Sequence, residues 1–259
     1  MKFAIPSYKR PTELKEQTLT YLNTHKIETK DIFIFVRNDD EKLPEYLELK
    51  EQGYNVIIAY GVFGIGKTHN FITAFFDEDE FICEIDDDLK FIMNEKREPI
   101  TDLSKEIDDM VLIMIENNIN YGGTYQCDNP RFMSGNKKYT FDLRYMLGLF
   151  RIRRIKKDIF LETNYAEDME NCIKYYIRDG QILKNNWLAG KTKNYANGGC
   201  DGDGRNFETE KKDKVFLAEK YPDYCKLFQR KNGRWDLRLS FRSKKSKIHE
   251  QYQPAEPPQ

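Results

Sequence analysis

The sequence predicts an α/β protein with an open, mostly parallel sheet flanked by helices. Two observations support this fold. Short apolar runs alternate with longer amphipathic segments over residues 2–117, which is the pattern of βαβ units. The 259 residues also include 39% hydrophobic and 14% aromatic residues, which is enough to bury a core and too many aromatics for a disordered chain.

Strands and helices alternate in the first half, and each is supported by its own pattern. The run 31–37 (DIFIFVR) is apolar at successive positions, which is typical of a strand buried on both faces. Pro11 suits the first turn of a helix, and Leu14 and Leu22 lie on one side of that helix. The predicted strands are 2–6, 31–37, 54–60 and 80–85, and the predicted helices are 11–25, 43–51, 68–76 and 103–117.

The second half is less regular. Its predicted strands are 121–127, 139–143 and 147–153, and its predicted helices are 167–178 and 208–220. Residues 194–206 form a segment rich in Gly, Asn and Asp, which we expect to be a mobile lid. We expect the tail 250–259 to be disordered.

Composition narrows the class of protein. Residues 1–130 contain 14 basic and 26 acidic residues, whereas residues 131–259 contain 28 and 17, so the second half is suited to contact with a polyanion. The five cysteines lie far apart without a CxxC pair, which excludes a zinc ribbon and argues against a disulfide scaffold. No apolar run approaches the length of a membrane span, so we expect a cytoplasmic protein with no membrane partner.

Two interpretations of the first half are open. The segment Gly61–Thr68 (GVFGIGKT) fits the phosphate-binding loop pattern GxxxxGK[ST] and lies between a predicted strand and a predicted helix. It therefore suggests a P-loop nucleotide or polynucleotide kinase or ATPase. However, only 17 residues separate Thr68 from Asp86, so the two predicted strands on either side would have to be neighbours. The N-terminal IPSYKRP also has no role in this interpretation.

The second interpretation uses the polar ends of all four predicted strands. Parallel strands place their carboxyl ends at one edge of a sheet, where ligands bind. Polar residues follow these strands at 6–10, 36–39, 64–70 and 86–88. Together they predict one ligand-binding crevice.

These residues resemble those of GT-A nucleotide-sugar glycosyltransferases, whose mark is a DxD motif at a strand end, here Asp86-x-Asp88. The combination of IPSYKRP, GIGKTHNF and EIDDDL looks more narrowly like the TET-associated glycosyltransferase family over roughly residues 1–180. That family comprises phage enzymes, related to the base J glucosyltransferase, that glycosylate hydroxymethylated pyrimidines in DNA. The resemblance implies a nucleotide-sugar-binding half at 1–130 and a basic, acceptor-binding half of the same domain at 131–249.

The resemblance also implies a donor site for a UDP-sugar with Mn²⁺ or Mg²⁺. Asp88 and Asp86 would hold the metal, Asp86 facing either the ribose or a metal-bound water, and Asp87 would assist or form the turn. A hard divalent cation prefers such oxygen ligands and stabilises the charge of a leaving diphosphate. Further donor contacts are expected from Pro6, Ser7, Tyr8, Arg10, Asn38, Gly64, Gly66, Lys67 and Asn70.

Glu167 and Asp168 begin a predicted helix and match the acidic pair that many GT-A enzymes place beside the acceptor. If the reaction inverts configuration, one of them, preferably Asp168, would deprotonate the acceptor hydroxyl. If the reaction retains configuration, the same residue would orient the acceptor or the sugar.

The expected acceptor is DNA, because basic residues cluster at 131–158 and 226–249 with aromatic residues among them. A base inside a duplex must be flipped out to reach the donor, and Tyr125, Tyr145 or Trp187 would hold it. The resemblance thus implies transfer of glucose or arabinose from a UDP-sugar to 5-hydroxymethylcytosine, in the host cytoplasm if a phage encodes the protein.

Overall fold

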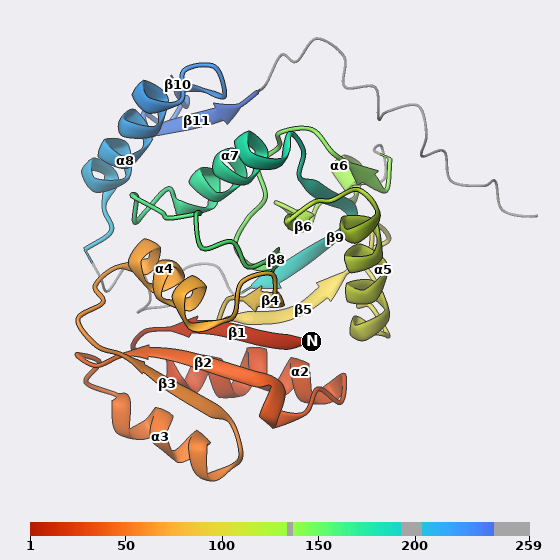
Figure 1. The fold of residues 1–259 in the computed structure, drawn as a ribbon, viewed down its shortest axis with the longest axis vertical. Coiled ribbons are helices and arrows are strands. Elements are labelled where there is room, and N and C mark those ends of the chain that lie inside the picture. Colours follow the sequence, from red (N-terminus) through yellow and green to blue (C-terminus); the bar gives the residue numbers. More distant parts are fainter. Residues whose placement is uncertain (134–136, 193–203, 241–259) are drawn as a thin grey trace, which may run out of the picture.

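The structure is a computed structural model that describes residues 1–133, 137–192 and 204–240, and in these residues a mixed nine-stranded sheet forms the centre. Eight of its strands follow the order β3-β2-β1-β4-β8-β6-β9-β5, and β7 pairs with β9 (Figure 1). A separate two-stranded sheet, β10-β11, lies with helix α8 at one end of the molecule, and α3 lies at the other (Figure 1).

The first half contains the parallel part of the sheet. Strands β3, β2, β1 and β4 lie side by side and are all parallel. The strands are β1 (Lys2–Ser7), β2 (Ile32–Arg37), β3 (Asn55–Ala59) and β4 (Phe81–Ile85). The helices are α1 (Pro11–Glu13), a π-helical turn (Leu14–Leu19), α2 (Thr20–Thr24), a 3₁₀ turn (Thr29–Asp31), α3 (Leu43–Glu51) and α4 (Ile65–Phe75).

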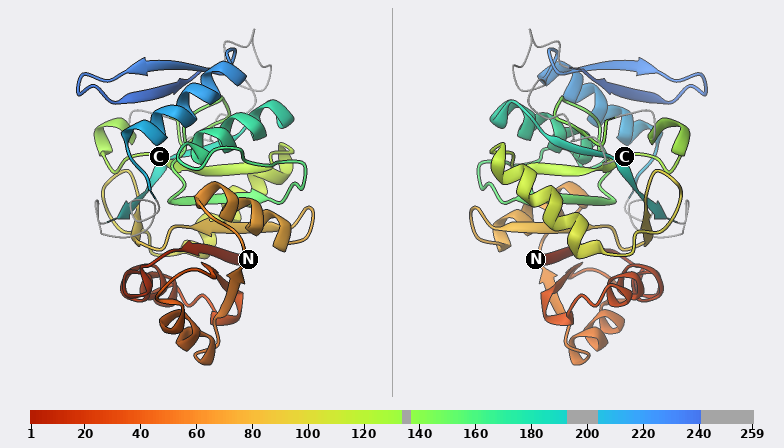
Figure 2. Two further views of the ribbon diagram at one scale, coloured as in Figure 1. Left: turned by 90° about the vertical axis from the view of Figure 1, so that its left-hand side faces the viewer. Right: turned by 90° about the vertical axis from the view of Figure 1, so that its right-hand side faces the viewer.

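Alternation along the strands explains why helices cover both faces. Phe3 and Ile5 of β1 pack in the core with α2, α3 and α5, whereas Ala4 packs in a second core with Ile72 of α4. Figure 2 shows α4 and α7 on one face of the sheet and α5 on the other. The α/β fold predicted from the sequence is confirmed.

The chain from β5 onward adds antiparallel strands to the same sheet. Strand β8 runs antiparallel between β4 and β6, and β9 runs parallel to β6. The strands are β5 (Leu89–Met93), β6 (Tyr121–Tyr125), β7 (Tyr139–Thr140), β8 (Phe150–Arg154), β9 (Leu183–Thr192), β10 (Cys225–Gln229) and β11 (Trp235–Leu239). The helices are α5 (Leu103–Glu116), α6 (Pro130–Met133), α7 (Glu167–Asp179) and α8 (Phe207–Lys220).

Strands β5, β9, β10 and β11 were not predicted from the sequence. The longest of them, β9, carries Lys184, Asn185 and Asn186, which are buried and interrupt the apolar pattern that marks a strand. Tertiary hydrogen bonds satisfy two of these polar groups: Lys184 donates to the carbonyl of Tyr145, and Asn186 donates to the carbonyl of Lys137.

The strand order contradicts the P-loop interpretation. That interpretation requires the strand before Gly61–Thr68 to neighbour the strand before Asp86. Instead, β2 and β1 lie between β3 and β4. Helix α4 begins at Ile65, three residues before the predicted start, so Gly66 and Lys67 lie in its first turn.

Strands from both predicted halves, 1–130 and 131–249, share the one sheet. Residues 194–203 of the expected lid and the tail 250–259 lie outside the described residues. Within the described part of the chain, none of the helices has the length and hydropathy that a membrane span requires.

Candidate active site

A cleft of about 800 Å³ opens at the carboxyl ends of β1 and β4. The residues after these strands form one wall, the beginnings of α4 and α7 form the floor, and α8 with the β10-β11 hairpin forms the opposite wall. This position at the polar strand ends is where the sequence predicted the ligand site.

The acidic turn after β4 brings charge to the cleft. Asp86 lines the cleft, and burial together with the carboxylates of Asp88 and Asp168 raises the pKa of Asp86 to about 8. Asp87 is almost completely buried, and its Oδ2 accepts a hydrogen bond of 2.6 Å from the Ser7 hydroxyl. Burial raises the pKa of Asp87 to about 6, although Arg10 opposes this rise.

Arg10 ties the end of β1 to this acidic turn. Its guanidinium lies 2.5 Å from Oδ1 of Asp87 and donates to Oδ2 of Asp88 at 3.1 Å. The backbone N–H of Arg10 donates to the hydroxyl of Tyr46, which also bonds Ser7. Pro6, Ser7, Tyr8 and Arg10 were predicted donor contacts, and the structure places all four in the lining of the cleft.

Arg37, at the end of β2, belongs to the same wall and was not among the predicted site residues. Its guanidinium carbon lies 4.1 Å from the centre of the Tyr8 ring and 5.2 Å from that of Phe63. Asp39 fixes the guanidinium with two hydrogen bonds of 2.8 and 2.6 Å. Arg37 could have been identified from its place between a buried strand and the polar pair Asn38-Asp39.

Gly64 and Gly66 allow a close approach, and the partner in the structure is the chain itself. A Cβ atom on Gly66 would overlap the carbonyl oxygen of Thr163, and one on Gly64 would overlap the side chain of Asn164. Gly64 also has a φ of +94°, which favours glycine. The two glycines therefore dock α4 against residues 163–164, and Gly64 lines the cleft.

Four predicted donor contacts lie outside the lining of this cleft, namely Gly66, Lys67, Asn70 and Asn38, and so does the predicted metal ligand Asp88. Lys67 is exposed on α4. The amide of Asn70 donates to and accepts from the backbone of Leu161 at 2.8 and 2.7 Å, which holds the loop before α7. Asn38 accepts a hydrogen bond from the backbone of Gly61 and thus fixes the turn after β3. The side-chain amides of Asn70 and Asn38 are therefore bonded to backbone groups of the chain itself.

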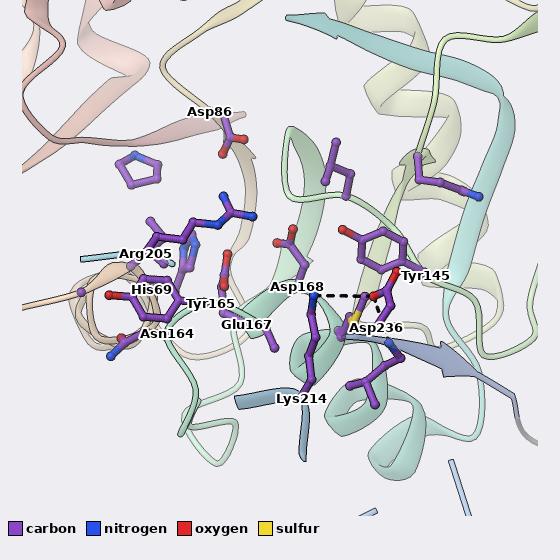
Figure 3. Close-up of a pocket in the computed structure, with 18 of the residues that line it drawn as sticks. His69, Asp86, Tyr145, Asn164, Tyr165, Glu167, Asp168, Arg205, Lys214 and Asp236 are labelled. Atoms are coloured by element: carbon purple, nitrogen blue, oxygen red, sulfur yellow. Dashed lines mark hydrogen bonds and ion pairs between the residues drawn. The ribbon is translucent and has the colours of Figure 1, made fainter. Parts of the chain in front are cut away.

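The predicted acidic pair, Glu167 and Asp168, begins α7 and lines the cleft. Figure 3 shows both carboxylates in the middle of the pocket, between Asp86 and the Lys214–Asp236 ion pair. Burial and the adjacent Asp168 raise the pKa of Glu167 well above its usual range. Asp168 therefore lies at the centre of the cleft, where its carboxylate could contact a reacting group of a bound ligand.

A buried network of charges fixes Asp168. Arg151 of β8 is fully buried and donates to Oδ1 of Asp168 and Oε1 of Glu84, both at 2.9 Å. Arg153 lies 2.6 Å from Oε2 of Glu84, and His69 contacts the same carboxylate. Burial alone would raise the pKa of Glu84, but Arg151, Arg153 and His69 hold it well below its usual range.

This network corrects one prediction. The basic cluster 131–158 was expected to contact DNA phosphates, but Arg151 and Arg153 are buried beneath the cleft. Lys156 is also buried and pairs with Asp79. Arg151 and Arg153 compensate the buried carboxylate of Glu84, and Lys156 is held by the exposed Asp79, so these side chains are not available to an external phosphate.

The opposite wall of the cleft is basic. Its cations are Arg205, Lys214, Arg230, Arg234 and Arg238, and the carboxylates among them are Glu210 and Asp236. Tyr145 also lines the cleft, whereas Tyr125 and Trp187 are not among its lining residues. Burial and the carboxylates of Asp168 and Glu167 raise the pKa of Tyr145 well above its usual range. The predicted basic residues beyond 240 lie outside the described residues.

Comparison by sequence found no match, either to a protein family or to a curated protein. The fold, by contrast, is similar to those of solved glycosyltransferases. Staphylococcus aureus TarS 1–349 in complex with UDP-GlcNAc has a TM-score of 0.56 at 16% identity, over 84% of this chain and 67% of that one. Glucosyl-3-phosphoglycerate synthase from Mycobacterium tuberculosis, with Mn²⁺, UDP and glucosyl-3-phosphoglycerate, has a TM-score of 0.53 at 10% identity, over 92% and 86%.

The mannosyltransferase PcManGT from Pyrobaculum calidifontis, in complex with GDP-Man and Mn²⁺, has a TM-score of 0.50 at 9% identity, over 71% of this chain and 56% of that one. In another TarS 1–349 structure this chain spans only 60% of the length. At these low identities the similarity concerns the fold. The chain has a GT-A-like fold, as the sequence predicted.

Proposed function

We propose that the protein is a metal-dependent glycosyltransferase that moves a sugar from a UDP-sugar to 5-hydroxymethylcytosine in DNA. The observation that carries the proposal is one cleft that joins three parts: Asp86 at a strand end, Asp168 at a helix start and a basic wall opposite. The GT-A-like neighbours supply the donor class, since their structures contain UDP-GlcNAc, UDP with Mn²⁺, and GDP-Man with Mn²⁺.

The strand ends would hold the donor. Tyr8 and Arg37 form a flat aromatic and cationic surface at the ends of β1 and β2, which suits a nucleobase. Arg10 would donate to the diphosphate, since a guanidinium has five N–H donors and can keep its contacts with Asp87 and Asp88. The backbone turn at Gly64 approaches the same cleft.

The acidic turn fits a divalent cation. Burial first, and then the carboxylates of Asp88 and Asp168, raise the pKa of Asp86, and a bound cation would stabilise its ionised form. No group of three or more potential metal-ligating side chains occurs among the described residues, and Mg²⁺ or Mn²⁺ held with a substrate diphosphate needs only one or two carboxylates. Asp86 and Asp88 would hold the ion, which stabilises the leaving diphosphate when bound.

Asp168 would act on the acceptor hydroxyl. Arg151 fixes one carboxylate oxygen, so the carboxylate has a defined orientation at the centre of the cleft. In an inverting reaction Asp168 would accept the proton of the hydroxymethyl group, and in a retaining reaction it would orient that group. Glu167, which favours its neutral form, would donate a hydrogen bond beside it.

The acceptor assignment uses the basic wall and Tyr145. Cations on this wall attract phosphates, and the proposed flipped base would lie against Tyr145, the one of the three predicted aromatics that lines the cleft. The narrower similarity of IPSYKRP, GIGKTHNF and EIDDDL to TET-associated glycosyltransferases supports the same acceptor.

The proposal is tested with hydroxymethylcytosine DNA, Mn²⁺ and a panel of UDP-sugars that includes UDP-glucose and UDP-arabinose. Nucleoside analysis by mass spectrometry should show the mass of one added sugar. Mn²⁺ with UDP should also raise the melting temperature, because a ligand that binds the native state stabilises it. Absence of both the sugar adduct and the thermal shift would refute the proposal.

A further inference from the structure

The β10-β11 hairpin carries its charged side chains on one face. Lys226 pairs across the strands with Arg238, and Phe228 pairs with Asp236. Beyond the last strand pair, the N–H of Arg230 donates to the carbonyl of Arg234. Because paired residues of antiparallel strands point to the same side, these six side chains share one face, which we call the ribbon face.

The other face of the hairpin is apolar and packs on the protein. Cys225, Leu227, Leu237 and Leu239 belong to a core cluster with Leu217 of α8 and Ile173 of α7. The hairpin is thus anchored through its apolar face. The ribbon face is turned toward the cleft and α8, where Asp236 pairs with Lys214 and Arg234 pairs with Glu210, and only its Lys226, Arg230 and Arg238 are exposed. Phe228, Arg230, Arg234 and Arg238 on the ribbon face also line the cleft that contains Asp168.

The ribbon face has a spacing that suits a nucleic-acid duplex. The row Lys226–Arg238 and the row Arg230–Arg234 are four residues apart along each strand. At about 3.4 Å per residue the two cationic rows lie about 13 Å apart. This separation is close to the width of the major groove of B-DNA, about 12 Å, so a ribbon whose strands cross the groove would set one row beside each bordering phosphate backbone.

Carboxylates hold the arginines in place without using all their donors. Arg230 donates through Nε to Asp236 at 2.7 Å, and Arg234 donates to the buried Glu210 at 2.6 Å. Each guanidinium has five N–H donors, so both retain donors for a phosphate. Arg238 is exposed and lies over the Phe228 ring, with its guanidinium carbon 5.4 Å from the ring centre. The ribbon face therefore has four cations and one carboxylate.

We propose that the ribbon face binds the phosphate backbone of the acceptor duplex and places a base opposite the Asp168 cleft. This inference rests on the proposed function for the identity of the acceptor. An anionic membrane is the less suitable partner, because interfacial binding needs several apolar side chains beside the cations. The ribbon face carries a single aromatic residue, Phe228, which lines the cleft.

The test compares two matched double variants. Lys226→Gln with Arg238→Gln removes two cations from the ribbon face. Lys26→Gln with Lys50→Gln removes one exposed cation just after α2 and one in α3, and both helices lie at the end of the molecule away from the hairpin (Figure 1). Binding of a labelled, unmodified 20-bp duplex is followed by fluorescence anisotropy from about 50 to 200 mM salt. Melting curves establish that all proteins are folded.

The wild type and the opposite-end variant should bind alike. The ribbon variant should lose roughly tenfold or more in affinity, and its slope of log K against log salt should be shallower by about 2, one per lost phosphate contact. Equal binding by the two variants, or no DNA binding by the wild type, would overturn the inference. If the ribbon variant alone loses binding to anionic vesicles but still binds DNA like the wild type, the inference is overturned in favour of a membrane.

The inference and the proposed function fail separately. The Mn²⁺- and UDP-dependent thermal shift and the sugar adduct are measured on the wild type and test the transferase. Normal DNA binding through the ribbon face without either signal supports the ribbon face and refutes the transferase. A sugar adduct with unchanged DNA binding by the ribbon variant refutes only the ribbon face.

Discussion

Arg151 links the stability of the fold to the orientation of Asp168, and replacing it separates the two effects. Arg151 and Arg153 are both fully buried and both pair with Glu84, but Arg151 alone of these two donates to Asp168. Arg151→Met and Arg153→Met each remove one partner from a buried charge. Loss of such a partner costs about 3–5 kcal/mol of unfolding free energy, because the remaining charge stays buried.

The two variants should therefore lose similar stability and differ in activity. In a protein of this size, about 3–5 kcal/mol corresponds to a fall in melting temperature of roughly 6–20 °C. Urea denaturation measures this loss. Sugar transfer is then measured well below both melting temperatures, where Arg151→Met should lower kcat by about 100-fold, because a reacting group displaced by about 1 Å loses that much. Arg153→Met should keep kcat close to that of the wild type.

Two results would refute this reasoning. If both variants lose kcat equally, the effect of Arg151 is a general effect of the network on folding. If Arg151→Met keeps full kcat, then the 2.9 Å bond from Arg151 does not orient Asp168 for catalysis.

Three further predictions concern the cleft and the core. In the wild type, Asp86 keeps its proton up to about pH 8 in the folded state, whereas the unfolded chain has already lost it, so the free energy of unfolding falls as the pH rises from 4 to 8. Asp86→Asn should remove this fall and so be more stable than the wild type in that range. The same variant should abolish the Mn²⁺-dependent thermal shift. Gly66→Ala should destabilise by about 1–3 kcal/mol in urea denaturation, because its Cβ would overlap the Thr163 carbonyl, and an unchanged midpoint would contradict this packing. Burial lowers the pKa of Lys184 to about 8, so between pH 8 and 10.5 the unfolded chain binds more protons than the folded state, and stability should rise with pH. Lys184→Met should remove this rise, which melting curves measured across the same pH range would show.

Local patterns predicted the first half of the fold and much of the site. Apolar runs of strand length ended at polar residues, and the parallel order of β1 to β4 then brought Ser7, Arg10 and Asp86 to one edge. Glu167 and Asp168 were predicted from their place at the start of a helix, and both line the cleft. These features depend on neighbours within a few residues, so the sequence shows them directly.

The contacts of the predicted residues were less predictable. Gly66 and Asn70 looked like donor contacts, but they hold the loop 161–164, which lies about ninety residues away in the chain. The β10-β11 hairpin was not predicted, because charged and apolar residues alternate along both strands and the segment was interpreted only as a basic stretch.

The sequence by itself determined the alternation of strands and helices, the acidic turn after β4 and the acidic start of α7. Only the tertiary structure decided the role of Arg151 and Arg153, which read in the sequence as a basic surface. Both arginines are buried because β8 pairs with β4, and this pairing sets Arg151 opposite Glu84. Burial of a charge is stable only beside its counter-charge, and here the partner lies 67 residues away, so local sequence carries no sign of it.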